Sequence, residues 1–133
     1  METPLVSVNM PVYNGAAYIK EAIESIVQQT YPHWELIVVN DASTDDTVQI
    51  VNAFKDERIK LVHNKKQLGL AHVRNVAIAA STGKYIAILD SDDIACKERL
   101  ALQVAFLEAH LEYCLVCSWV NAIDISNASF EHW

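Results

Sequence analysis

The stretch Tyr85-Ile86-Ala87-Ile88-Leu89-Asp90-Ser91-Asp92-Asp93 passes abruptly from apolar to acidic residues. Its apolar part is short and rich in strand-forming side chains, which favours a strand buried on both faces of a parallel sheet. Three carboxylates then follow within four positions, where such a strand would reach the surface. Because like charges this close repel, the cluster is costly unless a cation shares it or water screens it.

A hard divalent cation is the natural partner of this acidic cluster. Mg²⁺ keeps most of its water and takes only one or two protein carboxylates, so that substrate phosphate oxygens complete its shell. The same residues also fit an acidic loop or a helix N-cap, with Asp93 near the start of the next helix. The cluster by itself leaves both interpretations open.

Strands and helices are predicted to alternate along the chain. Apolar runs predict strands at residues 5–10, 35–40, 59–62, 85–90 and 113–118. Pro11 is expected to end the first strand, because proline cannot donate to a sheet ladder. Helical spacing of apolar residues predicts helices at residues 16–29, 48–54, 70–80 and 100–111. Ser43 and Asp46 stand at capping-box spacing before the second of these helices.

This alternation predicts an α/β fold with a doubly wound, mainly parallel sheet that carries helices on both faces. Ligands of such sheets bind beyond the carboxyl ends of the strands. Asn14, Asp41 and the Asp90 cluster each follow a different predicted strand. We therefore expect these segments to meet in one crevice, with Asn14 as a turn residue rather than a ligand contact.

Length and composition restrict the class of protein. The chain has 133 residues, which suits a single domain, and a formal net charge of −7 with no long basic run, which argues against nucleic acid as a partner. It shows no signal-peptide pattern and no apolar stretch of about 20 residues, so we expect a cytoplasmic protein. The three cysteines, Cys96, Cys114 and Cys117, are interpreted as buried apolar thiols of a reducing compartment.

Several nucleotide-binding classes lack their signatures here. The chain contains only three glycines, with neither a dinucleotide-binding fingerprint nor a phosphate-binding loop. A receiver-type phosphorylation domain needs carboxylates after its first strand, where this chain has Pro11-Val12-Tyr13-Asn14. The remaining candidates are enzymes or binding domains that hold a nucleotide through other contacts.

Five segments, in order, carry a resemblance to a known family. They are residues 11–14 (PVYN), 25–31 (SIVQQTY), 35–45 (ELIVVNDASTD), 69–75 (GLAHVRN) and 83–93 (GKYIAILDSDD). Together they resemble the motifs of glycosyltransferase family 2, whose members are inverting enzymes with the GT-A fold, a Rossmann-like nucleotide-diphospho-sugar transferase fold. The resemblance runs from about residue 5 to residue 118, and it departs from the family at Asn40, where a second aspartate is frequent.

The resemblance implies a nucleotide-sugar site and a metal site. The implied nucleotide-sugar-binding residues are Pro11, Val12, Tyr13, Asp41, Arg74, Asp90, Ser91 and Asp92. Asp41 would accept a hydrogen bond from a uracil-type N–H, and Arg74 would approach the base or the diphosphate. Asp92 would ligate Mn²⁺ or Mg²⁺ at the diphosphate, and Asp90 would face the ribose or the metal shell.

The implied reaction is the transfer of a sugar, with inversion, from a nucleotide-diphosphate sugar such as a UDP-sugar to an acceptor hydroxyl. The acceptor would be a carbohydrate or a lipid-linked glycan in polysaccharide or surface-glycan synthesis, with membrane association in the full-length protein. The general base is expected beyond Trp133, which would make residues 1–133 one donor-binding domain truncated before the acceptor-binding half. Apolar surface left open by the missing half is expected to favour a homodimer.

Two alternatives stay open at this point. A sugar-phosphate nucleotidyltransferase would use a related sheet and metal, but it normally carries a glycine-rich, basic loop after the first strand, and none is seen here. A domain that binds nucleotide sugars without catalysis would share every feature of this chain. A carboxylate base in the full-length protein would argue against that second alternative.

Overall fold

The structure, a computed structural model, describes residues 3–132. The predictions about the two chain ends concern in part residues 1, 2 and 133, which lie outside this range. The elements follow in the order β1 (Val6–Val12), α1 (Ile19–Val27), β2 (Trp34–Asn40), α2 (Thr47–Ala53), β3 (Ile59–His63), α3 (Leu70–Ala80), β4 (Tyr85–Ile88), α4 (Arg99–Ala109), β5 (Asn121–Ile123) and β6 (Ser129–His132). The chain divides into two compact units, residues 1–101 and 102–133.

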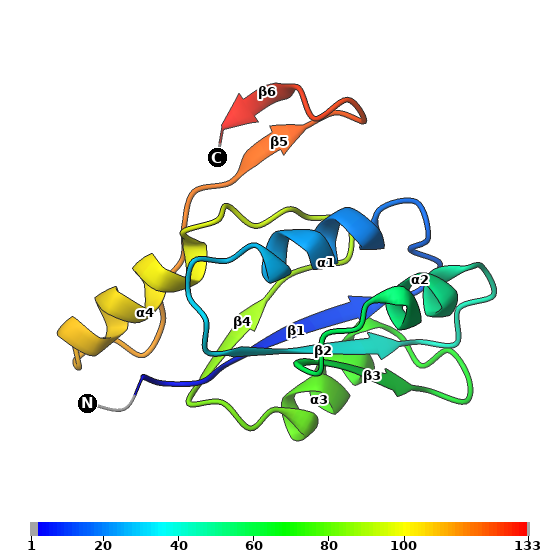
Figure 1. Cartoon of the computed structure of the whole chain (residues 1–133), viewed down its shortest axis with the longest axis horizontal. Coiled ribbons are helices and arrows are strands. Elements are labelled where there is room, and N and C mark those ends of the chain that lie inside the picture. The colour runs from blue at the N-terminus through cyan, green and yellow to red at the C-terminus, as the bar shows by residue number, and fades with distance from the viewer. Residues whose placement is uncertain (1–2, 133) are drawn as a thin grey trace. The chain divides into compact units, whose positions relative to one another are not determined.

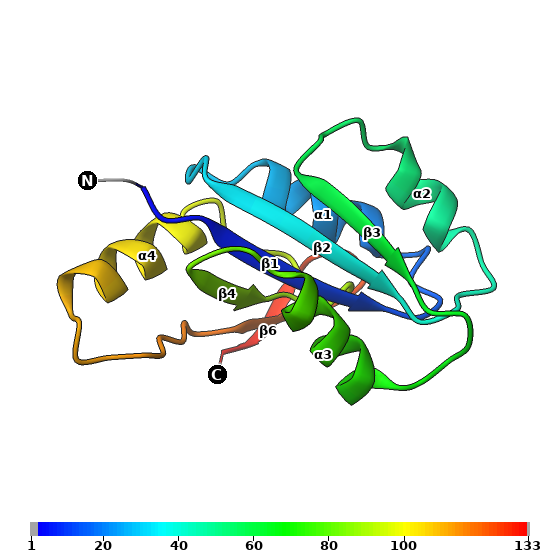
Figure 2. The same ribbon diagram turned by 90° about the horizontal axis from the view of Figure 1, so that it is seen from below.

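The first unit is built on a parallel sheet with the strand order β3-β2-β1-β4. The helix α3 packs on one face, where its Val73 and Ala77 meet Ile37 and Val39 of β2. The helices α1 and α2 lie on the other face, and Figures 1 and 2 show the two layers from perpendicular directions. The predicted doubly wound α/β sheet is therefore confirmed. The expectation of a single domain stays a prediction.

Both central strands are buried along their whole length. Every residue of β1 and of β2 is buried. A strand that is covered on both faces needs apolar side chains at nearly every position, and the sequences VSVNMPV and WELIVVN largely supply them. These two strands hold the core and fix the position of the loops that follow them.

Pro11 does not end the first strand as predicted, because β1 continues to Val12. The carbonyl of Asn9 accepts a hydrogen bond from Leu89, on the β4 side, and that of Val12 accepts one from Asp41, on the β2 side. The backbone groups of Pro11 face the same side as those of Asn9, which is the last β1 residue paired with β4. The pairing with β4 ends before Pro11, so no strand offers its N–H a hydrogen-bond acceptor on that side. The N–H that proline lacks is therefore not missed.

The strand of the opening stretch is also different from the prediction. β4 lies at the edge of the sheet, ends at Ile88 rather than at Asp90, and alternates between half-buried and exposed residues. Ile86 is 46% exposed and Ile88 is 51% exposed. The apolar run predicted burial on both faces, but α3 covers β1 and β2 and leaves this face of β4 open.

Two local predictions around the helices are wrong. Ser43 and Asp46 do not form a capping box, because the backbone N–H of Ser43 donates to Asn40 Oδ1 and Asp46 itself stands at the N-cap of α2. Asp45 takes this role, since its Oδ1 accepts a hydrogen bond from the backbone N–H of Thr47. The first helix begins at Ile19 rather than at residue 16, because residues 14–16 are bound to the loop before α2.

The second unit contains most of α4 and an antiparallel pair formed by β5 and β6. The predicted strand at residues 113–118 is wrong, because no strand is found there. The prediction that Cys96, Cys114 and Cys117 are buried is also wrong, since all three are exposed. A short apolar segment is buried only where another element packs against it, and Leu115 in this segment is 72% exposed.

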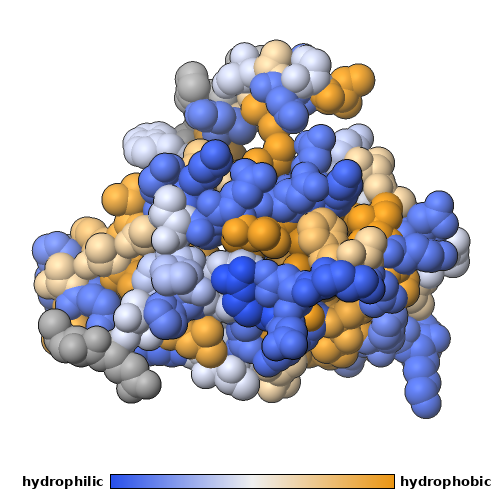
Figure 3. Space-filling view, in the orientation of Figure 1, coloured by the Kyte–Doolittle hydropathy of each residue, from blue (hydrophilic) through white to orange (hydrophobic). Residues whose placement is uncertain are grey.

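Hydrophobic residues lie at the surface of this unit over β5 and the turn that follows it, in orange at the top of Figure 3. Trp119 is 89% exposed and Ile125 is 94% exposed. Across residues 3–132, no helix is both long enough and apolar enough to cross a membrane.

Candidate functional site

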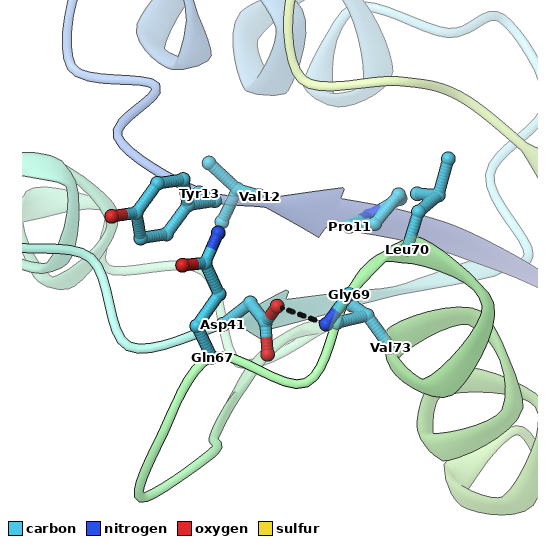
Figure 4. A pocket seen from close by; sticks show the side chains of 8 residues that line it. All are labelled: Pro11, Val12, Tyr13, Asp41, Gln67, Gly69, Leu70 and Val73. Atoms are coloured by element: carbon cyan, nitrogen blue, oxygen red, sulfur yellow. Dashed lines mark hydrogen bonds between the residues drawn. The ribbon is translucent and has the colours of Figure 1, made fainter.

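A pocket of about 140 Å³ lies at the carboxyl ends of the central strands. It is lined by Pro11, Val12, Tyr13, Asp41, Gln67, Gly69, Leu70 and Val73, as Figure 4 shows. Four of the sequence-predicted site residues, Pro11, Val12, Tyr13 and Asp41, are therefore brought together. The Tyr13 ring is 46% exposed, so it belongs to the pocket rim and not to the core.

Asp41 is the most strongly held side chain of the pocket. It is only 3% exposed, and its carboxylate accepts hydrogen bonds from Asn64 Nδ2 at 2.8 Å, from Leu68 N at 3.0 Å and from Gly69 N at 2.8 Å. Burial raises the pKa of Asp41, but these three donors and the nearby His72 outweigh burial and lower it below its ordinary value. The carboxylate is therefore ionised and acts only as an acceptor.

The loop between β3 and α3 is folded around this carboxylate. Its last residue before α3, Gly69, has a φ of 86°, in the left-handed region where glycine carries no steric penalty. The N–H groups of Leu68 and Gly69 both donate to Asp41. This loop and the start of α3 bring Gln67, Leu70 and Val73 to the pocket. The sequence did not predict these three residues. The one available signal was Gly69, a glycine directly before a predicted helix.

The turn after Tyr13 is fixed by the loop before α2. The backbone N–H of Asn14 donates to Ser43 Oγ at 2.9 Å, and that of Gly15 donates to Thr47 Oγ1 at 2.9 Å. In return Asn14 Oδ1 accepts a hydrogen bond from Thr44 N at 2.8 Å. Asn14 has a φ of 51° and is thus the turn residue that was predicted. These contacts hold Tyr13 at the pocket rim.

Arg74 and Asp90 form a second group beside the pocket and do not line it. The Arg74 Nη2 lies 3.2 Å from Asp90 Oδ1, and the two side chains are 38% and 44% exposed. The Arg74 Nε is buried and has no hydrogen-bond partner among the described residues. Ser91 lies against the turn after β1, since its Oγ is 3.4 Å from the position that a Cβ on Gly15 would take.

The carboxylates of the acidic cluster act on one another. Burial, followed by the charges of Asp92 and Asp90, raises the pKa of Asp93. Asp92 is exposed beside it. A cation placed among these carboxylates would relieve their repulsion, and the metal ion expected from the sequence stays a prediction.

The described residues do not form a complete metal site by themselves. Among residues 3–132, no group of three or more His, Cys, Asp or Glu side chains is placed to hold an ion. Mg²⁺ and Mn²⁺ prefer hard oxygen ligands, and Mg²⁺ commonly takes one or two carboxylates together with substrate phosphates. Asp90 and Asp92 offer oxygen ligands of the kind that these ions prefer, and among the described residues they are too few to hold an ion by themselves.

Comparison with known protein families gives a match over almost the whole chain. Residues 7–132 match the model of the family described as glycosyl transferase family 2. The chain is 43% identical over 107 residues, 80% of its length, to the Escherichia coli protein WfgD. That protein is named as a UDP-Glc:alpha-D-GlcNAc-diphosphoundecaprenol beta-1,3-glucosyltransferase.

Two solved structures with the same fold are similar to this chain. TarS of S. aureus, residues 1–349 in complex with UDP-GlcNAc, is 35% identical with a TM-score of 0.78 over 80% of this chain. The mannosyltransferase PcManGT of Pyrobaculum calidifontis, in complex with GDP-Man and Mn²⁺, is 34% identical with a TM-score of 0.74. This chain spans 42% of WfgD and about a third of each crystallised chain.

Proposed function

This chain belongs to glycosyl transferase family 2 and has the GT-A fold, and from that premise we propose that it binds the nucleotide-diphosphate sugar donor, a UDP-sugar, of an inverting transfer reaction. The observation that carries the proposal is the position of the Asp41 pocket and the Arg74–Asp90 pair at the carboxyl edge of one parallel sheet. Nucleotides bind at this edge in open α/β sheets.

Each part of the donor has a matching group in this arrangement. The buried Asp41 carboxylate accepts an N–H of the base, and the exposed Tyr13 ring offers a face for stacking. Arg74 presents a fork of donors suited to phosphate oxygens. Asp90 and Asp92 would hold Mg²⁺ or Mn²⁺ together with the diphosphate, and a metal bound there supplies positive charge where the leaving group becomes negative.

The acceptor side of the reaction is proposed from the relatives. WfgD is named for a lipid-linked, diphosphoundecaprenol acceptor, and we propose an acceptor of this carbohydrate or lipid-linked class for the protein to which this chain belongs. Its place would be polysaccharide or surface-glycan synthesis on the cytoplasmic side. Inversion at the anomeric carbon follows the family and requires a general base that removes the acceptor proton.

Thermal unfolding with UDP, GDP, dTDP and CDP, each with and without Mn²⁺, tests the donor site. A nucleotide at about 100 times its dissociation constant stabilises the native state by about 2.7 kcal/mol, which raises the Tm by several degrees. We expect a metal-dependent rise with UDP. No rise with any of the nucleotides would contradict the proposal.

A further inference from the structure

Residues 25–31 form one of the five segments that resemble the family, but none of these described residues lines the pocket beside Asp41. They comprise the end of α1 and the turn after it. Their polar groups bind the loop between β4 and α4, which carries the acidic cluster. We propose that Gln29 is a positioning residue, which fixes this loop so that its carboxylates can hold the cation of a bound diphosphate. This inference rests on the proposed function, since it concerns the same site.

The Gln29 carboxamide is buried and uses both of its ends. Its Nε2 donates to the carbonyl oxygens of Ser25 at 3.0 Å and of Cys96 at 2.7 Å, and its Oε1 accepts a hydrogen bond from Leu100 N at 3.0 Å. A carboxamide has two N–H donors and one carbonyl oxygen, so both donors and the acceptor are engaged. Leu100 is the second residue of α4, and its N–H therefore has no partner within the helix. Gln29 supplies that partner.

Two neighbours of Gln29 hold the same loop. Ser25 Oγ accepts a hydrogen bond from Ala95 N at 3.0 Å, and Thr30 N donates to the carbonyl oxygen of Lys97 at 2.9 Å. Figure 1 shows this loop, in yellow-green, beside α1. The second half of the loop is thus attached to the end of α1 through several consecutive residues.

The acidic residues lie between these contacts and the end of β4. On the β4 side, Leu89 N donates to the carbonyl oxygen of Asn9 at 3.2 Å. Within the turn, Asp93 N donates to the carbonyl oxygen of Asp90 at 3.1 Å. The acidic turn is therefore anchored by Leu89 before it and by Ala95 after it, which restricts the positions that its carboxylates can take.

The acidic turn needs such anchors because it carries three carboxylates within four residues. Their mutual repulsion favours conformations in which they lie farther apart. Groups that orient the ligands of a metal without touching it commonly change its affinity by about 10–100-fold. Gln29 would act in this way, through the loop that carries Asp90 and Asp92 and not by contact with the metal.

Gln29→Met tests the proposal, because methionine is of similar size but has no N–H donor and only a weak acceptor. Calorimetric titration gives the affinity for UDP with Mg²⁺ and with EDTA, at a temperature at which every variant is folded. The ratio of these two affinities should fall about tenfold in Gln29→Met, while the affinity in EDTA should stay unchanged. Amide hydrogen exchange at Leu100 should become about fivefold faster, because its N–H loses one neutral hydrogen bond.

Three further variants separate this role from a loss of folding stability. Gln28→Met makes the same substitution at the exposed neighbouring residue and should keep both affinities. Glu35→Gln alters a buried network at the amino end of β2, so it should lower the Tm and leave the ratio unchanged. Ser25→Ala removes the acceptor of the Ala95 N–H, and it should lower the ratio as Gln29→Met does.

An unchanged ratio in Gln29→Met would overturn the role of Gln29 while the proposed donor site stands. If Gln29→Met does not fold, an unchanged ratio in Ser25→Ala would overturn it instead. An equal fall of the ratio in Glu35→Gln would also overturn it, because the effect would then be one of general stability. If the unchanged chain binds UDP equally well with Mg²⁺ and with EDTA, the inference falls and the nucleotide pocket stands. If it binds no UDP, the proposed function falls as well.

Discussion

The Asp41 carboxylate, directly after β2, accepts a 2.8 Å hydrogen bond from the backbone N–H of Gly69, directly before α3. One buried charge thus closes the loop between β3 and α3 onto the end of the neighbouring strand. The residue that the family resemblance assigns to the nucleotide base also builds the pocket in which the base would lie. Changes at Asp41 are therefore expected to alter folding stability and ligand binding together.

Asp41→Asn should lower both properties. Its amide places an N–H group against donors of the loop, so at least one buried donor loses its partner, at a cost of about 1–3 kcal/mol. Urea denaturation measures this loss, and titration with UDP should show much weaker binding. An unchanged unfolding midpoint would mean that the loop is held by other contacts.

Arg74→Ala should weaken nucleotide binding but have little effect on folding stability. The Arg74–Asp90 pair is more than a third exposed on both sides, so its loss should change the free energy of unfolding by less than about 1 kcal/mol. The affinity for UDP should fall by about tenfold, since a charge-assisted contact to phosphate is lost. Equal losses in stability and affinity would assign Arg74 a structural role.

Asp92→Asn should abolish the metal-dependent part of nucleotide binding and leave the fold intact, because Asp92 is exposed. Glu57→Gln is the matched control, since it removes the same charge from another exposed residue. Glu57 precedes the amino end of β3, whereas Asp92 follows the carboxyl end of β4. Unfolding with UDP, with and without Mn²⁺, measures both variants. If metal-dependent stabilisation persists in Asp92→Asn, the metal is bound by other residues.

The stability of the fold should fall in acid because of Glu35, which is 5% exposed. Burial raises its pKa, but hydrogen bonds from Lys60, Ser7 and Thr82 outweigh burial and lower the pKa from 4.5 to about 2. A lowered pKa gives stability that is present above about pH 4.5 and is lost as the pH falls through about 2, at most about 3 kcal/mol. The difference in unfolding free energy between the unchanged chain and Glu35→Gln should shrink over this range. A difference that is independent of pH would contradict the prediction.

Gly83→Ala should destabilise the protein more than Gly69→Ala. A Cβ at Gly83 would lie 2.7 Å from the backbone oxygen of Leu5 and 2.7 Å from the backbone nitrogen of Ser7, so the sheet must shift, at a cost of about 1–3 kcal/mol or more. A Cβ at Gly69 meets no atom within 4 Å, and only its positive φ costs energy, about 1 kcal/mol. Chemical denaturation of the two variants gives the order.

The sequence predicted the helices and strands whose apolar residues recur at the regular spacing of that element. The helix at residues 70–80 was predicted with the bounds that the structure shows, because Val73, Val76, Ala77 and Ala80 form one helical face against the sheet. β2 was predicted to within one residue for a similar reason, since a fully buried strand is an unbroken apolar run. The segment at residues 113–118 has a comparable composition, but it stays largely exposed: Leu115 is 72% exposed, and Tyr113 contacts only the rings of Phe106 and His110 among the described aromatic pairs. No local pattern reveals that.

The sequence alone determined the parallel α/β sheet, the strand at residues 35–40 and the placement of Tyr13, Asp41 and the Asp90 cluster after the ends of different strands. These follow from hydrophobic periodicity and from the handedness of strand–helix–strand connections, which are local rules. Only the tertiary structure decided that Asp41 accepts hydrogen bonds from the β3–α3 loop, that Gln67 lines the pocket and that β4 lies at the sheet edge. Those features depend on contacts between residues far apart in sequence, and no single stretch of the chain encodes them.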